Sequence, residues 1–148
     1  MTTSLILIVL SVLGMINAAY LSYAHLLDSG GCGNGFGCDE VVASPYSNLG
    51  GVPFSVFGLG LYVAILIASW RSLHGNLRAE SMRWISLFAL VGNLPTLFLL
   101  YLQAFVIGAW CPFCALSAAT ILSILVLSLT DRNRNTMLRP FVGSLISR

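Results

Sequence analysis

Charged residues are scarce in this chain. Of its 148 residues, 8% are charged and 57% are hydrophobic, and the mean hydropathy is +0.91. A soluble domain carries about 25% charged residues. The composition therefore excludes a water-soluble globular domain and predicts a single domain solvated by lipid. The net charge is only +2, and we expect no nucleic-acid partner.

Basic residues are absent from the first apolar run, residues 5–27, which is long enough to cross a bilayer. A secretory signal peptide would have a basic start and a shorter apolar core, but residues 2–27 contain no Lys or Arg. The run is therefore predicted to be a membrane span that stays in the protein.

Fingerprints of the common redox cofactors are absent as well. The sequence has no glycine motif of a flavin or nicotinamide site, and Cys114 is followed by Ala115, which excludes a c-type haem attachment. We expect no flavin and no bound metal. Any electron acceptor should then be a separate molecule, and in a membrane a lipid-soluble quinone is the natural choice.

The apolar residues fall into four runs, at about residues 5–27, 52–70, 84–108 and 112–129. Each has about the length of a transmembrane helix. The predicted fold is thus an all-α membrane protein, a bundle of four transmembrane helices. Pro95 predicts a kink in the third run, which membrane helices tolerate, and residues 71–83 should form a polar hairpin.

A long polar segment, residues 28–51, separates the first two runs. Its glycines, concentrated between residues 29 and 37, argue against a helix and predict a mobile loop. Residues 39–44 are expected to form a short helix with an acidic first turn, which Pro45 would end.

The seven arginines all lie in the 71–83 hairpin or after the fourth run, at positions 71, 78, 83, 132, 134, 139 and 148. The positive-inside rule predicts that this side is cytoplasmic, together with both termini. Residues 1–130 are predicted to form the transmembrane redox domain, and residues 131–148 a basic cytoplasmic tail. In a bacterial inner membrane the 28–51 loop would then face outward, where disulfides persist.

The cysteines form two close pairs, Cys32/Cys38 in the loop and Cys111/Cys114 where the fourth run begins. Residues three apart share one face of a helix, so the second pair can hold a disulfide or act as a dithiol. Pro112 suits the first position of a helix, which places Cys111 where free N–H groups favour a thiolate. The alternative is plain packing of small apolar side chains, but two pairs on one oxidising face favour redox chemistry.

Two such pairs can form a relay of thiol–disulfide exchange. The mobile pair Cys32/Cys38 suits contact with a water-soluble thiol, and the pair at the lipid boundary suits a quinone. Quinone reduction creates an oxyanion that needs a hydrogen-bond donor. Ser44 is a candidate donor, and its alternative role is that of a helix or turn cap.

Three more residues are candidates for the quinone site, each with a structural alternative. Asn93 could contact the quinone or satisfy backbone groups freed by Pro95. Phe54 and Phe113 could line the quinone pocket or simply pack in the bundle.

The order of these motifs resembles the vitamin K epoxide reductase family, and its bacterial homologues most of all. The resemblance covers about residues 5–129. It consists of a Cys-x5-Cys pair, a serine six residues later, a span, and Trp-Cys-Pro-Phe-Cys opening the fourth span. Oxidases of the DsbB type have the Cys-x-x-Cys pair first in the sequence and the more widely spaced pair second.

The resemblance implies a role for each of these residues. Cys114 would contact the quinone, and Cys111 would exchange with the loop pair through Cys38. Cys32 would meet the external partner, and Ser44 would lie at the quinone head group. The implied activity is that of a quinone-dependent oxidase that supports disulfide bond formation.

Two departures from the family refine this expectation. Many bacterial members carry a fused thioredoxin-like domain, whereas this sequence stops soon after the fourth run, so its partner should be a separate, DsbA-like thioredoxin-fold protein. Residues 115–119 are Ala-Leu-Ser-Ala-Ala, where animal enzymes carry a tyrosine-bearing patch. Ubiquinone or menaquinone is therefore expected as the substrate.

Two other functions fit the same cysteines. Four thiolates could hold zinc, although Cys-x5-Cys is a loose spacing for a zinc site. The chain could also be a structural membrane subunit with static disulfides.

Overall fold

The computed structural model describes residues 2–26, 37, 41, 44, 47–49, 51–73 and 78–146, with side chains in the last helix described as far as residue 133. Its elements in chain order are α1 (Thr2–Leu26), β1 (Asn48–Leu49), β2 (Val52–Pro53), α3 (Phe54–Arg71), α4 (Arg78–Leu102), the π-helix η3 (Gln103–Ile107) and α5 (Pro112–Ile146). The two short strands pair antiparallel, with Leu49 opposite Val52.

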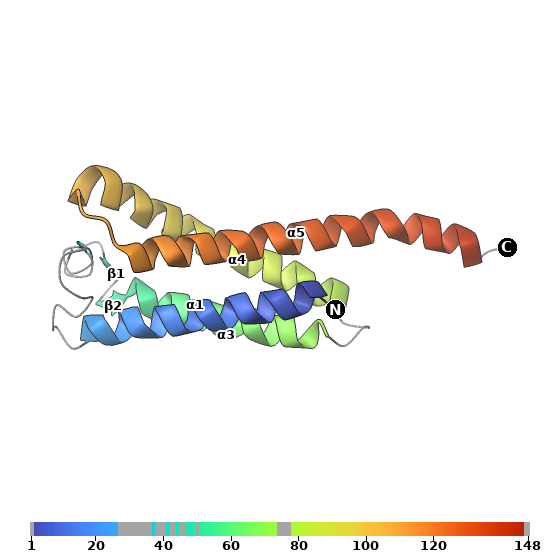
Figure 1. The fold of residues 1–148 in the computed structure, drawn as a ribbon, viewed down its shortest axis with the longest axis horizontal. Helices are drawn as coiled ribbons and strands as arrows, with labels where there is room; N and C mark the ends of the chain where they lie inside the picture. Colours follow the sequence, from blue (N-terminus) through green and yellow to red (C-terminus); the bar gives the residue numbers. More distant parts are fainter. Residues whose placement is uncertain are drawn as a thin grey trace.

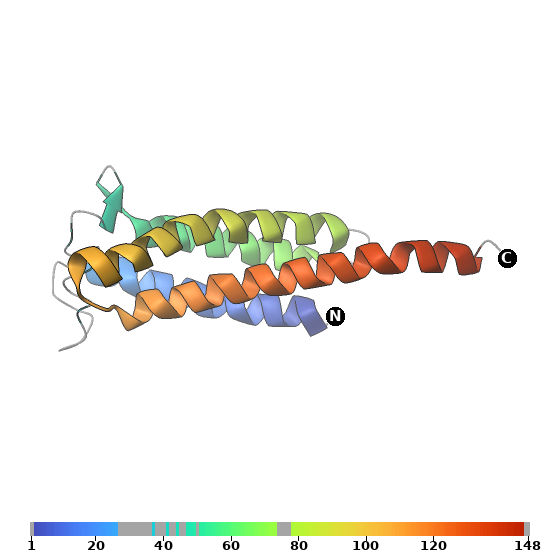
Figure 2. The same cartoon turned by 90° about the horizontal axis from the view of Figure 1, so that it is seen from above.

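The helices form an elongated bundle in which α1 packs on α3, α4 packs on α5, and the two pairs lie against each other. Figures 1 and 2 show the β1–β2 hairpin and the link from η3 to α5 at one end of the bundle. The N-terminus lies at the other end, beyond which α5 projects (Figure 1).

Four helices in the described ranges are long and apolar enough to cross a membrane, at Thr2–Leu26, Phe54–Arg71, Arg78–Ile107 and Pro112–Asn133. Their large side chains point outward as well as inward: Val9, Leu94 and Phe105, for example, are more than half exposed. An outer surface of this kind is stable in lipid but not in water. The prediction of an all-α bundle of four transmembrane helices is confirmed.

Two helix boundaries differ from those predicted. The third helix begins at Arg78, inside the expected hairpin, because Glu80 lies in its first turn and accepts a hydrogen bond from Trp84 Nε1 (3.0 Å). Arg78 is also held there by an ion pair with the largely buried Asp131 of α5, in which its Nη2 donates to both carboxylate oxygens (3.0 and 3.2 Å).

The fourth helix was expected to end near residue 129, yet α5 continues to Ile146. Residues 130–139 contain neither Gly nor Pro, so nothing in them ends the helix. The tail is therefore helical where it follows the span, and the domain boundary at residue 130 stays a prediction.

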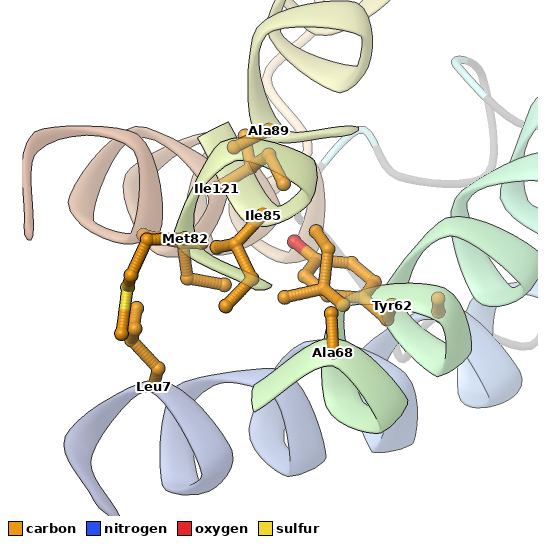
Figure 3. Packing of buried hydrophobic residues seen from close by; sticks show 10 residues of the cluster. Leu7, Tyr62, Ala68, Met82, Ile85, Ala89 and Ile121 are labelled. Carbon is orange, nitrogen blue, oxygen red and sulfur yellow. The ribbon is translucent and has the colours of Figure 1, made fainter. Parts of the chain in front are cut away.

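The core lies between all four helices in the half of the bundle far from the hairpin. Figure 3 shows Leu7 of α1 and Met82 of α4 among its buried side chains, with Tyr62 of α3 pointing toward α4 and α5. Small hydroxyl side chains complete the helix contacts: hydrogen bonds join Ser72 Oγ to Ser4 Oγ (2.9 Å) and Ser86 Oγ to Ser128 Oγ (3.1 Å). Small residues and interhelical hydrogen bonds of this kind drive helix association in lipid.

Asn93 belongs to this packing. It is buried, and its Nδ2 donates to the carbonyl of Ala89 in its own helix (2.8 Å) and, at 3.5 Å, to that of Ile121 in α5. Pro95 lies two residues further on inside α4. In the structure Asn93 therefore bonds to backbone carbonyl groups, which is the kind of role given above as the alternative to quinone contact.

We predict that Gly14→Ala destabilises the bundle. A Cβ at this position would overlap the ring of Tyr62, which is almost completely buried between helices. Overpacking of this kind costs about 1–3 kcal/mol, and denaturation in detergent would measure it.

Gly60→Ala is the matched control for this substitution. Gly60 lies in α3, and nothing lies within 4 Å of the position that an added methyl group would take. The change should therefore leave stability equal or raise it by up to about 1 kcal/mol. Equal stability of the two variants would show that the contact between Gly14 and Tyr62 is not tight.

Candidate functional site

The chain reverses direction between α4 and α5 through a π-helix and a glycine. Residues 103–107 form η3, which Gly108 ends in the left-handed conformation (φ 69°, ψ 13°). The Gly108 N–H donates to the Gln103 carbonyl (3.1 Å). Short π-helical turns are frequent at functional sites, and this one leads directly into the Cys111/Cys114 pair.

Helix α5 begins at Pro112, as predicted, so Cys111 immediately precedes its first turn. Cys111 has no exposed surface, and the Cys114 backbone N–H donates to its Sγ (3.3 Å). The hydrogen bond from the Cys114 thiol lowers the pKa of the Cys111 thiol to about 7, and the N–H groups of Cys114 and Phe113 act in the same direction against the effect of burial. The arrangement supplies a thiolate near neutral pH.

Cys111 and Cys114 face different surroundings. Cys111 packs among Leu21, Ala24 and Ala109 and against Val41 of the 28–51 segment. Cys114 is partly exposed and lines an apolar cavity of about 340 Å³. One sulfur is therefore beneath the loop while the other opens into the bundle.

The cavity lies between the helices beside this pair. Its walls are mostly aliphatic and aromatic, with a few polar groups, and the lining comprises Ala18, Leu21, His25, Val41, Ser47, Pro53, Phe54, Ser55, Phe57, Gly58, Leu61, Tyr62, Val91, Gly92, Pro95, Thr96, Leu99, Leu100, Gln103, Cys114, Ser117 and Ile121. Its size and apolar character suit a small hydrophobic ring compound.

The structure brings some of the predicted site residues together. Phe54, at the start of α3, lines the cavity with Cys114. Asn93 and Phe113 are not among the lining residues; Phe113 instead packs on Tyr20 of α1 at a ring-centroid distance of 5.0 Å. Cys32 and Cys38 lie outside the described residues.

Ser44 also lies outside the cavity lining. Its Oγ donates to the Val41 carbonyl (2.7 Å), which is the turn-capping role weighed against that of oxyanion donor. Ser47, three residues later, does line the cavity, and its Oγ donates to the Ser44 carbonyl (2.8 Å). Sequence reasoning missed Ser47, because a polar loop gives no periodic signal from which to choose between two serines.

The 28–51 segment approaches the turn before α5 at Gly37. Gly37 has φ 67°, and a Cβ there would lie 3.0 Å from Ala109 Cβ and 3.1 Å from the Trp110 backbone nitrogen. The Gly37 carbonyl accepts the N–H of the buried Val41 (3.2 Å). The residue directly before Cys38 in the sequence thus touches the segment that leads into Cys111.

Gln103 is another residue that sequence reasoning missed. It is completely buried, its Oε1 accepts the Cys111 N–H (3.1 Å), and it lines the cavity. The signal was present in the sequence as an amide side chain in an apolar run, since polar side chains inside membrane spans are expensive and mark functional sites.

Comparison with known proteins agrees with this geometry. Residues 5–129 match the vitamin K epoxide reductase family. The chain belongs to this family. It is thus an oxidoreductase by family, and its four apolar helices make it a multi-pass membrane protein.

One curated relative is the thiol-disulfide oxidoreductase LTO1 of Arabidopsis thaliana. Its sequence is 32% identical to that of the present chain over 125 residues. The match covers 79% of this chain but only 33% of the plant protein. The chain therefore spans about a third of that relative's length.

We predict that Cys114→Ala raises the pKa of Cys111 from about 7 toward the ordinary thiol value of about 8.5, because the largest stabilising hydrogen bond is lost. Titration of the thiolate ultraviolet absorbance, in a background with Cys32 and Cys38 replaced by serine, measures this change. Cys114→Ser keeps an O–H donor and should shift the pKa less. If Cys111 had the same pKa in all three proteins, the hydrogen bond from the Cys114 thiol would not be the cause of the lowered pKa.

We also predict that Gly37→Ala slows exchange between the two cysteine pairs. The new methyl group would press on Ala109 and Trp110, and the positive φ adds strain. Gly51→Ala is the control, since Gly51 has φ 89° but nothing within 4 Å of a Cβ. Stopped-flow measurement of the thiol–disulfide exchange rate compares the two variants. If both slowed exchange equally, backbone strain alone would explain the effect.

Proposed function

We propose that this protein is a quinone-dependent thiol oxidase of the membrane. The observation that carries the proposal is the division of the Cys111/Cys114 pair between two environments. The first thiol lies beneath the outer loop, and the second opens into an apolar cavity between the helices. A pair placed in this way can receive electrons from one side and pass them to the other.

The burial of Cys111 supports a two-step transfer of electrons from a water-soluble thiol, first to the loop pair and then to Cys111. With no exposed surface, Cys111 offers nothing for a soluble protein thiol to attack. The loop pair Cys32/Cys38 would receive the electrons first, with Cys32 meeting the partner. Cys38 would then attack Cys111, and Gly37 already contacts the adjacent Trp110 backbone.

In the exchange step, the Cys38 thiolate attacks Cys111 of the 111–114 disulfide and releases Cys114 as a thiolate. Cys32 then displaces Cys111, which closes the loop disulfide and leaves Cys111/Cys114 as a dithiol. In the last step the dithiol passes two electrons and two protons to the quinone, which becomes a hydroquinone while the 111–114 disulfide re-forms.

The ends of the bundle support an orientation for this chemistry. Arg71 and Arg78 lie at the end away from the cysteine turn, and Asp131 pairs with Arg78 there. By the positive-inside rule this end would be cytoplasmic. The site would then face the outer side of a bacterial inner membrane, where a separate thioredoxin-fold protein of the DsbA-like kind would be the electron donor.

The cavity favours a simple membrane quinone, ubiquinone or menaquinone, because its walls are apolar and open between the helices. Ser44 and Asn93 have protein partners for their side-chain donors. Phe54 remains our proposed ring contact, and Phe113, through its packing on Tyr20, would hold the first turn of α5 in place.

The test is quinone reduction by purified protein supplied with a reduced thioredoxin-fold partner and a short-chain ubiquinone. We expect Cys114→Ala to reduce turnover to background, since no second sulfur remains to close the disulfide. Ser123→Ala, an exposed position on the same helix, should keep full turnover. The proposal fails if wild-type protein reduces no quinone or if Cys114→Ala remains fully active.

Trapping resolves the order of the relay. Cys32→Ser should accumulate a disulfide between Cys38 and Cys111, because the resolving thiol is missing. Cys38→Ser, mixed with the partner in its disulfide form, should accumulate Cys32 bound to the partner, because the Cys32 thiolate attacks the partner disulfide and no Cys38 thiol is present to displace the partner. Mass spectrometry of the trapped species identifies each bond. The reverse pairing would exchange the roles of the two loop cysteines.

A further inference from the structure

The side-chain amide of Gln103 is hydrogen-bonded at one end only. Its oxygen accepts the backbone N–H of Cys111 at 3.1 Å. Its nitrogen, Nε2, is buried and has no hydrogen-bond partner among the described residues. Since buried polar groups in folded proteins are nearly always paired, an unpaired amide donor beside a reactive thiol requires an explanation.

The direction of the amide follows from the chemistry of its partner. The backbone N–H of Cys111 can only donate, so the atom facing it has to be the oxygen of Gln103. An exchange of oxygen and nitrogen would bring two donors together. The NH₂ group is therefore held on the opposite side of the amide from Cys111.

The cavity adjoins Gln103. Gln103 and Cys114 both line it, although they come from η3 and α5. The unpaired donor and the sulfur proposed to face the quinone thus share one apolar space.

Two other polar side chains on the cavity wall, those of Thr96 and Tyr62, have already used their donors. Thr96 Oγ1 donates to the Gly92 carbonyl (2.7 Å), and the Tyr62 hydroxyl donates to the Ser117 carbonyl (3.2 Å). Both O–H groups are used within the protein and are not available to a ligand. The amide of Gln103 differs from both, because its remaining hydrogens point to no protein acceptor in the described part of the chain.

We propose that Gln103 is a ligand-binding residue whose Nε2 donates a hydrogen bond to a carbonyl oxygen of the quinone bound beside Cys114. This inference rests on the proposed function and deepens it, since it names the group that recognises the quinone. When the dithiol reduces the quinone, that oxygen gains negative charge before protonation, and the hydrogen bond strengthens. Gln103 keeps both of its N–H protons throughout; the protons of the hydroquinone come from the thiols.

The same amide would also couple binding to the thiol pair. One planar group connects the backbone of Cys111 to the ligand, so a quinone held by Nε2 would be fixed relative to the start of α5. A carbonyl-bearing ring would be preferred over a hydrocarbon of equal shape, because the hydrocarbon would leave the donor unpaired.

The test compares two ligands in matched variants. The ligands are a short-chain ubiquinone and a hydrocarbon of similar ring size and tail without carbonyl oxygens, and binding to oxidised protein in detergent is measured by calorimetry. Gln103→Met removes the donor and keeps the length of the side chain. We expect about tenfold weaker ubiquinone binding and unchanged hydrocarbon binding.

Ser123→Ala is the control for the loss of a polar side chain away from the cavity, since Ser123 is exposed on α5 and is not among the lining residues. It should alter the affinity of neither ligand. Gln103→Glu provides a further readout: a protonated carboxyl can donate and an ionised one cannot. Its ubiquinone affinity should therefore recover as the pH falls, while that of Gln103→Met should not.

The inference would be overturned if Gln103→Met weakened the binding of both ligands equally, or weakened the binding of neither. The proposed function would still stand in that case, provided that the wild-type protein reduces quinone. Absence of quinone binding and reduction by the wild type would instead overturn the proposed function, and the inference with it.

Discussion

The site depends on how the first turn of α5 is fixed at the end of the bundle. Hydrogen bonds from two other helical segments hold it: the Gln103 oxygen binds the Cys111 N–H, and Asn17 of α1 donates to the Phe113 carbonyl and to Ser117 Oγ, each at 2.9 Å. In lipid such polar contacts cannot be replaced by water. They therefore fix the position of the cysteine pair relative to both the loop and the cavity.

With this turn fixed, neighbouring sulfurs can have different surroundings. Cys111, just before the helix, is covered by Val41 and Ala109, whereas Cys114, one turn later, reaches the cavity. Residues three apart on a helix are close enough for their thiols to form a disulfide. The same spacing still lets one thiol face the loop and the other face the apolar cavity. Electron transfer through this pair then needs no large movement of the helices.

Much of this could be predicted from the sequence, and the reasons are specific. Four apolar runs of sufficient length leave few alternatives to a helical bundle in lipid, and Pro112 marks the start of α5. The start of α4 could not be predicted, because it depends on the pairing of Arg78 with Asp131, residues 53 positions apart. The continuation of α5 through the polar tail was missed because the prediction followed hydropathy alone.

The site was predicted less completely, because motif spacing identifies reactive atoms but not their surroundings. The pair Cys111/Cys114 follows from its spacing and from Pro112. The choice between Ser44 and Ser47 depends on how a short loop turns, and the contact of Gln103 with Cys111 depends on the π-helix between them. Such tertiary contacts leave no periodic pattern in a sequence.

Several polar groups around the cavity share one property, which is that they are neutral. Asn17, Tyr62, Thr96 and Gln103 provide hydrogen bonds without a fixed charge, and a charge at this depth would be expensive in an apolar bundle. A neutral donor stabilises a transient oxyanion without attracting a permanent counter-ion or water. The lowered pKa of Cys111 adds a thiolate at this turn near neutral pH, and that charge would arise when Cys111 is reduced and disappear when the disulfide re-forms. The site would carry this charge only during the part of the cycle in which electrons are being transferred.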